Sequence, residues 1–222
     1  MSSRSIHNIC FHGIGTPKRE LEPGEGRYWI SVDAFLAMLD LLAGRPSVRI
    51  SFDDGNRSDV DVALDALRAR GLSATFFVVA GRLGAAGSLD VDDLRELDRA
   101  GMTIGSHGMD HRPWRGLPPA DLERELVVAR ARIADAVGHA VEEAALPLGI
   151  YDRRVLGALR RLGYAKVYTS DRRVARAADW LQPRFSVVAT DTPETLEANV
   201  LAAPSRPGAV WSRAKERIKR LR

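Results

Sequence analysis

The feature that most constrains the fold of this chain is a regular alternation of short apolar runs and longer amphipathic stretches. The short runs have strand length and are rich in β-branched and aromatic residues, whereas the longer stretches repeat apolar residues at the spacing of an α-helix. We expect strands at residues 6–11, 48–52, 74–79, 102–104, 141–146, 165–169 and 184–188. We expect the main helices at residues 32–43, 59–70, 90–100, 120–137, 153–162 and 192–203.

This alternation predicts an α/β fold around a parallel sheet, because parallel strands are joined by crossovers that are usually helical. A chain of 222 residues fits one large domain. We expect the domain to span residues 1–208 and to be followed by a basic tail at residues 209–222. If the sheet closes into a barrel, functional side chains gather at the carboxyl ends of its strands.

Two runs of reactive side chains follow expected strands. Asp53 and Asp54 come directly after the apolar run at 48–52, and His107 and His111 follow the run at 102–104. Neighbouring side chains on a strand point in opposite directions, so one carboxylate can face a metal while the other faces a water bound to it. On a helical turn, two histidines with three residues between them share one face. The runs therefore predict a divalent metal site for assisted hydrolysis.

Each run also has a plainer interpretation. The sequence Asp53-Asp54-Gly55 would suit a turn that starts a helix, and His107 and His111 could be ordinary loop residues. Two histidines and a carboxylate also occur in non-haem iron oxygenases. Those enzymes are built on antiparallel barrels, whereas this chain alternates strands with helices.

Together, the two runs resemble the first two motifs of the NodB-type polysaccharide deacetylases, the fourth carbohydrate esterase family: (Thr/Ser)-Phe-Asp-Asp-Gly and His-x-x-x-His. The interval between them is also similar, with Arg-x-Gly-Leu, Ala-Thr-Phe-Phe-Val and Ala-Gly-Met-Thr-Ile-Gly-Ser-His in order. The resemblance implies a distorted (β/α) barrel of about seven parallel strands, of the glycoside hydrolase–deacetylase type. It also implies a hydrolase that removes N-acetyl groups from an amino-sugar-containing polysaccharide, oligosaccharide or lipid-linked glycan.

The resemblance further assigns roles to the four residues. Asp53 is implied as the general base, and Asp54, His107 and His111 as the ligands of a divalent metal. Zinc is the first expectation for that metal, with iron, cobalt, nickel or manganese as alternatives. The same machinery could serve an O-acetyl sugar esterase, which remains an alternative function.

The chain departs from the family in the third motif region. Residues 146–151 are similar to the third motif, which lines the substrate groove, so Leu148 is implied as a substrate contact. The arginine that starts that motif and pairs with the base is replaced by Ala145, which keeps a catalytically impaired carbohydrate-binding barrel as an alternative. Arg184 could take over that pairing, or lie on the surface. Trp180 echoes the aromatic residue of the fourth motif that helps to form the acetyl pocket, although a core position is the plainer interpretation.

The family's fifth motif, Leu-x-His, normally lies near the C-terminus and supplies a general acid. No histidine follows His139, but the first expected strand ends in Ile-Cys-Phe and is followed directly by His12. We therefore expect a circularly permuted motif order, like that of the poly-N-acetylglucosamine deacetylases, with His12 as the acid. An incidental polar residue at the start of a loop is the alternative.

The basic pI of about 9.6 comes largely from the end of the chain. Residues 211–222 carry a net charge of +5 within a total of +4, so the other 210 residues sum to −1 and give no reason to expect a nucleic-acid partner. The tail places Trp211, Ala214, Ile218 and Leu221 at helical spacing opposite a basic face, as in helices that lie on anionic membranes. A closing helix of the barrel is the alternative. With one cysteine, no secretory signal and no membrane-spanning run, we expect a cytoplasmic protein with possible peripheral membrane contact.

Overall fold

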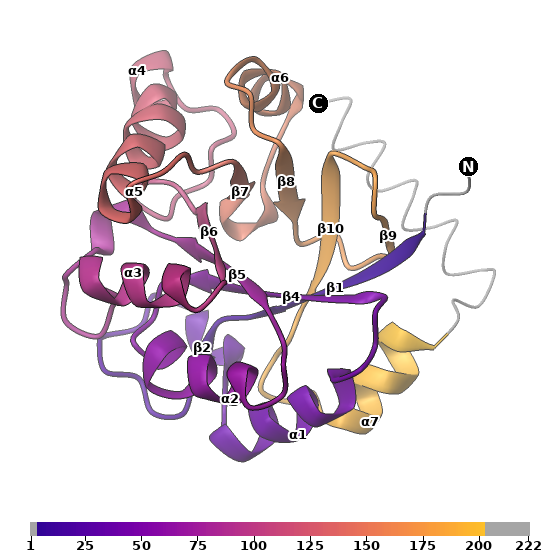
Figure 1. Cartoon of the computed structure of the whole chain (residues 1–222). Helices are drawn as coiled ribbons and strands as arrows, with labels where there is room; N and C mark the ends of the chain where they lie inside the picture. The colour runs from indigo at the N-terminus through magenta and orange to yellow at the C-terminus, as the bar shows by residue number, and fades with distance from the viewer. Residues whose placement is uncertain (1–3, 203–222) are drawn as a thin grey trace.

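Seven parallel strands close into a barrel in the computed structural model, which describes residues 4–202 (Figure 1). The strands follow one another around the barrel in chain order, and the last pairs with the first. Their bounds are β1 Ser5–Phe11, β4 Val48–Asp54, β5 Ala74–Val78, β6 Thr103–Ser106, β7 Glu143–Ala145, β8 Lys166–Thr169 and β10 Leu181–Ser186. The expected (β/α) barrel is confirmed.

The closing contact joins the two ends of the described chain. Strand β1 pairs with β10 in parallel, with Asn8 opposite Arg184 and Cys10 opposite Ser186. On its other side, β1 pairs with β4 over five positions, and Phe11 lies opposite Phe52. Figure 1 shows β1 in indigo beside β10 in orange. Residues from the start, the first quarter and the end of the chain therefore meet on three adjacent strands.

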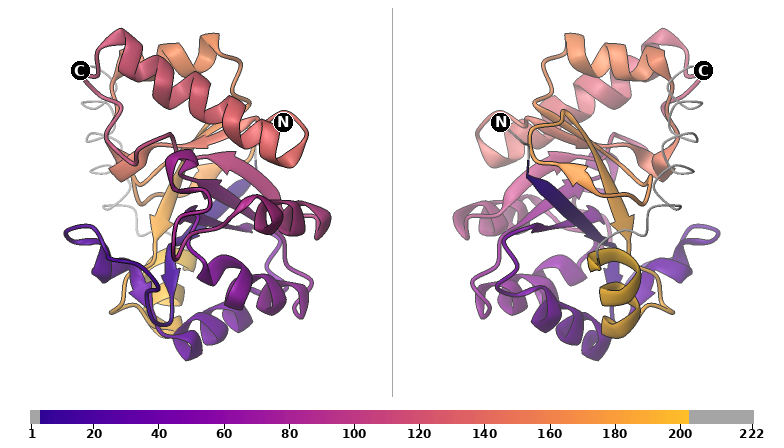
Figure 2. Two further views of the ribbon diagram at one scale, coloured as in Figure 1. Left: turned by 90° about the vertical axis from the view of Figure 1, so that its left-hand side faces the viewer. Right: turned by 90° about the vertical axis from the view of Figure 1, so that its right-hand side faces the viewer.

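Helices cover the outside of the barrel (Figure 2). Three of them are single α-helices: α1 Val32–Leu42, α3 Val91–Arg99 and α6 Arg153–Arg161. The others continue through a π-helical segment: η2 Asp59–Leu64 with α2 Asp65–Arg68, then α4 Pro119–Glu123 with η4 Arg124–Val128 and α5 Ala129–Val137, and α7 Pro193–Leu196 with η6 Glu197–Leu201. Side-chain caps begin several of them, and the Ser31 hydroxyl accepts from Ala34 N at 3.1 Å.

The strands divide their side chains between two environments. On β4, Ile50 and Phe52 belong to the large apolar core that also contains helix residues such as Phe35. The alternate residues Ser51 and Asp53 point the other way, toward Arg184 inside the barrel. This period of two places polar groups in the barrel interior and apolar groups beneath the helices.

Several short elements were not expected. The segment at 13–30, between the first expected strand and the first expected helix, contains β2 Gly13–Ile14 paired with β3 Trp29–Ile30, and the 3₁₀ turn η1 Glu25–Tyr28. Strand β9, Ala175–Arg176, runs antiparallel to β1, and 3₁₀ turns lie at η3 Ala80–Arg82 and η5 Pro147–Gly149. Strand β10 begins three residues before the expected start at 184, although Pro183 cannot donate to a ladder.

The basic tail at 209–222 and the helix expected within it lie outside the described residues. Between residues 4 and 202, none of the helices combines the length and the apolar character needed to cross a bilayer.

Candidate active site

Asp54, His107 and His111 converge at the mouth of the barrel, the rim formed by the carboxyl ends of its strands. Asp54 ends β4, and the two histidines lie in the loop after β6. Asp54 Oδ1 is 3.2 Å from His111 Nε2 and 3.6 Å from His107 Nε2. One ligand atom from each residue lies within 4.8 Å of the other two, and all three residues are buried.

Backbone turns, and not a helix, bring the two histidines together. Residues 107–111 form no helical turn, so the expectation of helical spacing was wrong in its geometry. Gly108 and His111 instead adopt left-handed conformations with φ of 82° and 51°, which fold the loop back on itself. A Cβ atom at Gly108 would lie 2.4 Å from Glu125 Oε2, so the position also lacks space for a side chain. Asp54 has a φ of 78° as well, which is uncommon for a residue other than glycine.

Outer hydrogen bonds set the tautomer of each histidine. His107 Nδ1 lies 2.9 Å from the carbonyl oxygen of Ala145, and His111 Nδ1 lies 2.7 Å from Glu22 Oε2. The nearest partner of each Nδ1 is an acceptor, and the Arg82 Nη2 donor lies farther from His111 Nδ1, at 3.5 Å. These contacts favour the tautomer with the proton on Nδ1, which leaves the Nε2 lone pair facing Asp54. Asp54 Oδ1 is buried and has no hydrogen-bond partner. Burial lowers the pKa of His107 to about 4, so its imidazole is neutral, as a metal ligand must be. The donor set fits a divalent metal.

Asp53 is held by a buried arginine from the last strand. Arg184 Nη1 and Nη2 donate to Asp53 Oδ1 and Oδ2, each at 2.6 Å, and Nη1 also donates to Ser51 Oγ at 3.1 Å. The Arg184 side chain is fully buried. Burial alone would favour a protonated Asp53, but the Arg184 charge outweighs it and holds the pKa of that carboxyl well below its usual range. Asp53 is therefore an ionised carboxylate at neutral pH.

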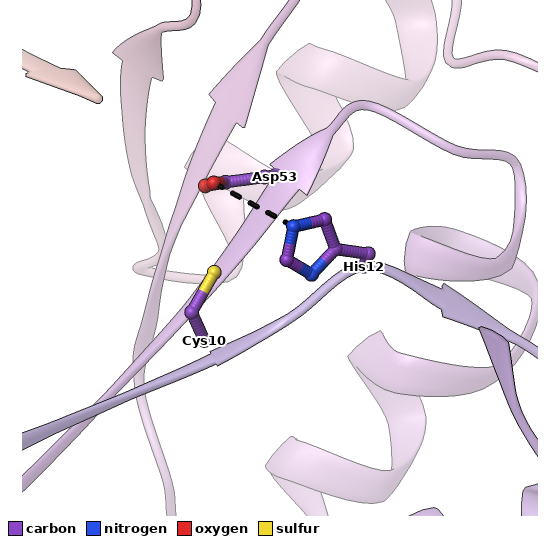
Figure 3. Close-up of side chains that lie close together, drawn as sticks. All are labelled: Cys10, His12 and Asp53. Atoms are coloured by element: carbon purple, nitrogen blue, oxygen red, sulfur yellow. Dashed lines mark ion pairs between the residues drawn. The ribbon is translucent and has the colours of Figure 1, made fainter. Parts of the chain in front are cut away.

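His12 approaches Asp53 from β1. Figure 3 shows its ring beside the carboxylate, with His12 Nε2 4.0 Å from Asp53 Oδ2. The ring stacks on Tyr28 with a centroid separation of 4.6 Å, and its Nδ1 is buried without a hydrogen-bond partner. Asp53 Oδ2 is also 3.7 Å from His107 Nε2, so this oxygen lies between the two imidazoles.

Cys10 lies beside this group, two residues before His12 on β1 (Figure 3). Its ligand atom could join those of His12 and Asp53 around an ion. However, burial raises the pKa of the Cys10 thiol well above its ordinary value, and Asp53 is already paired with Arg184. The Asp54 cluster is therefore the better candidate for a divalent metal, and Cys10 is a neutral thiol.

Leu148, Trp180 and Arg184 were expected to contact substrate, and the structure places Leu148 and Trp180 at opposite ends of the barrel. Leu148 lies just after β7 at the mouth, with 59% of its surface exposed. Trp180 precedes β10 and so lies at the amino end of that strand, away from the mouth. Its indole donates to the Tyr164 carbonyl at 2.7 Å and lies under the Arg160 guanidinium. Arg184 itself does not face a groove, because it is buried against Asp53.

Two acidic residues that the sequence analysis missed support the histidine loop. Glu125 is fully buried on η4, and its Oε2 accepts from Met109 N at 2.7 Å and from Trp114 Nε1 at 3.2 Å. Glu22 reaches His111 from the segment between β2 and η1. Neither stands out in a chain in which 28% of residues are charged, because their roles depend on contacts with distant segments.

Residues 43–167 match the family model described as polysaccharide deacetylase. The chain belongs to this family. The matched segment contains Asp53, Asp54 and both histidines of the cluster, but it starts after His12 and ends before Arg184. Those two residues therefore come from outside the part of the chain that the family model covers.

Two curated proteins align with just over half of the chain. A Bacillus subtilis (strain 168) protein named "Putative polysaccharide deacetylase YxkH" is 27% identical over 124 residues, which are 56% of this chain and 44% of that protein. The uncharacterized protein SCO4760 of Streptomyces coelicolor is 30% identical over 118 residues, covering 53% and 45% of the two chains. The chain thus spans less than half the length of these relatives.

Solved structures share the fold over most of the chain. Streptococcus pyogenes deacetylase PplD, solved in complex with acetate, has a TM-score of 0.77 at 20% identity and covers 91% of this chain and 100% of its own. IcaB from Ammonifex degensii has a TM-score of 0.69 at 22% identity, with coverages of 94% and 97%. These likenesses place the deacetylase-family barrel among known folds.

Proposed function

We propose that this protein is a metal-dependent hydrolase that removes N-acetyl groups from an amino-sugar-containing polysaccharide, oligosaccharide or lipid-linked glycan. The observation that carries the proposal is the convergence of two imidazole Nε2 atoms on the unpartnered, buried Oδ1 of Asp54, directly beside an ionised Asp53. Membership of the polysaccharide deacetylase family supports both the acetyl chemistry and the carbohydrate substrate.

Asp54, His107 and His111 would hold the metal, with zinc as the first candidate. When bound, such a metal polarises a carbonyl and makes a water molecule more acidic, which is what amide hydrolysis needs at neutral pH. Three protein ligands would match the number found in catalytic zinc sites. The acceptor beside each Nδ1 favours the tautomer that this role requires.

Asp53 and His12 divide the proton transfers. Asp53 accepts a proton from the attacking water at Oδ2, the oxygen nearest to both His107 and His12. Arg184 fixes both oxygens of that carboxylate, so the base has one orientation. Protonated His12 donates from Nε2 to the departing amine as the carbon–nitrogen bond breaks. The products are acetate and a free amino sugar.

The Arg184 pair bears on whether the protein is active. The arginine missing at Ala145 would leave the base unpaired, which favoured a barrel that binds carbohydrate without turning it over. Arg184 forms a bidentate pair with Asp53 from another strand, so this chain has an arginine partner for its base. That pairing supports an enzyme over a binding module.

The proposal is tested by acetate release. We expect purified protein to release acetate from N-acetylglucosamine oligomers, to lose this activity with a metal chelator and to regain it when zinc is added back. Release only from O-acetylated sugars would identify an esterase. Binding of the oligomers without acetate release from either substrate class, after metal addition, would contradict the hydrolase and favour the carbohydrate-binding barrel.

A further inference from the structure

The Nδ1 atom of His111 is held by a carboxylate from a segment far away in the sequence. Glu22 Oε2 accepts from it at 2.7 Å, and the two residues are 89 positions apart. The equivalent atom of His107 is held by the backbone carbonyl of Ala145. The two histidines thus have different outer partners, one charged and removable by mutation, the other neutral and part of the backbone.

A carboxylate behind a metal-binding histidine has a defined effect. It fixes the tautomer, orients the ring and increases the electron density on the nitrogen that faces the metal. At His111, Nε2 is the nitrogen nearest to Asp54 Oδ1, at 3.2 Å. Without Glu22, the neutral imidazole could place its proton on either nitrogen, and the Nε2–H form cannot bind a metal.

Glu22 is itself held in position. Its Oε1 accepts from Arg82 Nη2, so each carboxylate oxygen has its own donor. Its backbone N–H donates to Glu25 Oε2 at 2.9 Å, and Glu25 is buried and paired with Arg19. Arg19 in turn donates to Asn56 Oδ1 at 2.8 Å, close behind Asp54 in the chain. These contacts tie the segment between β2 and η1 to the end of β4.

We propose that Glu22 is a positioning residue for the metal site, acting through His111 to set its tautomer and to strengthen metal binding. The inference rests on the proposed function, because it takes Asp54, His107 and His111 as the ligands. It assigns a role in the metal site to the segment between β2 and η1, which supplies none of the three ligands.

Metal affinity measures this role directly. The test compares the zinc affinities of wild-type protein, E22A and E22Q by competition against a chromophoric chelator. E22A is expected to bind zinc about 10- to 100-fold more weakly, the range found for loss of an outer-shell partner. E22Q should lose less, because the amide oxygen can still accept from Nδ1 but carries no charge. Glu22 is 43% exposed, so neither change disturbs the core.

Glu20 provides a matched control, since it is another exposed acid of the same segment and E20Q makes the same chemical change. Imidazole nitrogen chemical shifts of metal-free protein give a second measurement. His111 should be the Nδ1–H tautomer in wild type and a mixture of both tautomers in E22A. A structural role alone would leave that tautomer unchanged.

The possible failures are distinguishable. Zinc affinity of E22A within about threefold of wild type would overturn the inference. The control is H111A, which should abolish zinc binding and so confirm that His111 is a ligand. An equal loss in E20Q and E22Q would also overturn it, because the effect would then be one of net charge. Wild-type protein that binds no zinc or other divalent metal would instead overturn the proposed function.

Discussion

Replacing Arg184 with methionine tests how the barrel keeps Asp53 ionised. Nη1 and Nη2 of the guanidinium each lie 2.6 Å from a carboxylate oxygen, and Arg184 is completely buried. R184M would leave a buried carboxylate without its cation, a loss that typically costs about 3–5 kcal/mol of unfolding free energy. For a chain of this length, each kcal/mol shifts the melting temperature by about 2–4 °C, so we expect a decrease of about 6–20 °C at pH 7.

The pH dependence of this deficit identifies its cause. In wild type, the Arg184 charge keeps the pKa of Asp53 below its unfolded value of 3.8, so the contribution of the pair is complete above that value and is lost only as pH falls through the lower, folded pKa. In R184M, the cation is gone and burial raises the pKa of Asp53 above the unfolded value. Folding of the variant then takes up a proton, so its deficit shrinks as pH falls.

Thermal melts and urea unfolding, both followed by circular dichroism at pH 7 and pH 5 with a chelator present, measure the fall in melting temperature and the pH dependence of the free-energy deficit. The chelator removes any contribution from metal binding. D53N and the D53N/R184M double variant complete a mutant cycle, in which we expect a coupling of about 1–3 kcal/mol for two groups in direct contact. Additive losses, or an R184M deficit that is the same at both pH values, would refute the argument that the pair keeps Asp53 charged.

Three further predictions concern the roles of Asp53 and His107, the loop at Gly108 and the basic tail. D53N should reduce the rate of acetate release by about 10²–10⁴-fold, the usual contribution of a general base, and should keep its metal. H107A should lose the metal, so metal analysis together with acetate release distinguishes the two variants. A fully active D53N would disprove the base assignment. G108A should destabilise the protein by at least about 1–3 kcal/mol, because it adds a side chain at φ of 82° against Glu125, and a thermal melt equal to wild type would contradict this. Deletion of residues 209–222 should abolish co-sedimentation with anionic liposomes, and unchanged binding would show that the basic tail is not a membrane anchor.

The meeting of Asp54 and His107 could be predicted because each lies at or directly after a strand end. Asp54 closes β4 and His107 follows β6, and neighbouring strands of a parallel barrel deliver such residues to one rim. His111 was predicted for the wrong local reason, since its approach depends on left-handed turns and not on a helix. The residue types and their spacing predicted that the three side chains meet, but they did not predict the backbone conformation that brings them together.

Trp180 shows that a short motif predicts a residue's role poorly when the end of the strand on which the residue lies is ignored. It precedes an expected strand in the sequence, and the residue before a parallel barrel strand lies at the amino end, opposite the mouth. That placement follows from topology alone and outweighs the similarity of two residues to a motif. Glu22 and Glu125 present the opposite difficulty, because only their distant contacts distinguish them from other acidic residues.

Closure of the barrel explains how residues from both ends of the described chain meet at Asp53. In a closed ring of strands, β1 and β10 are neighbours, and Arg184 lies opposite Asn8 in their register. Side chains from the first and the last strand therefore lie next to each other at the mouth, although they are far apart in the sequence. His12 follows β1 and Arg184 lies on β10, and both contact Asp53 although they are 172 positions apart in the chain. The arrangement around Asp53 depends on where each residue lies around the barrel and not on its order along the chain. Residues from before and after the segment 43–167, which matches the family model, can therefore both reach Asp53.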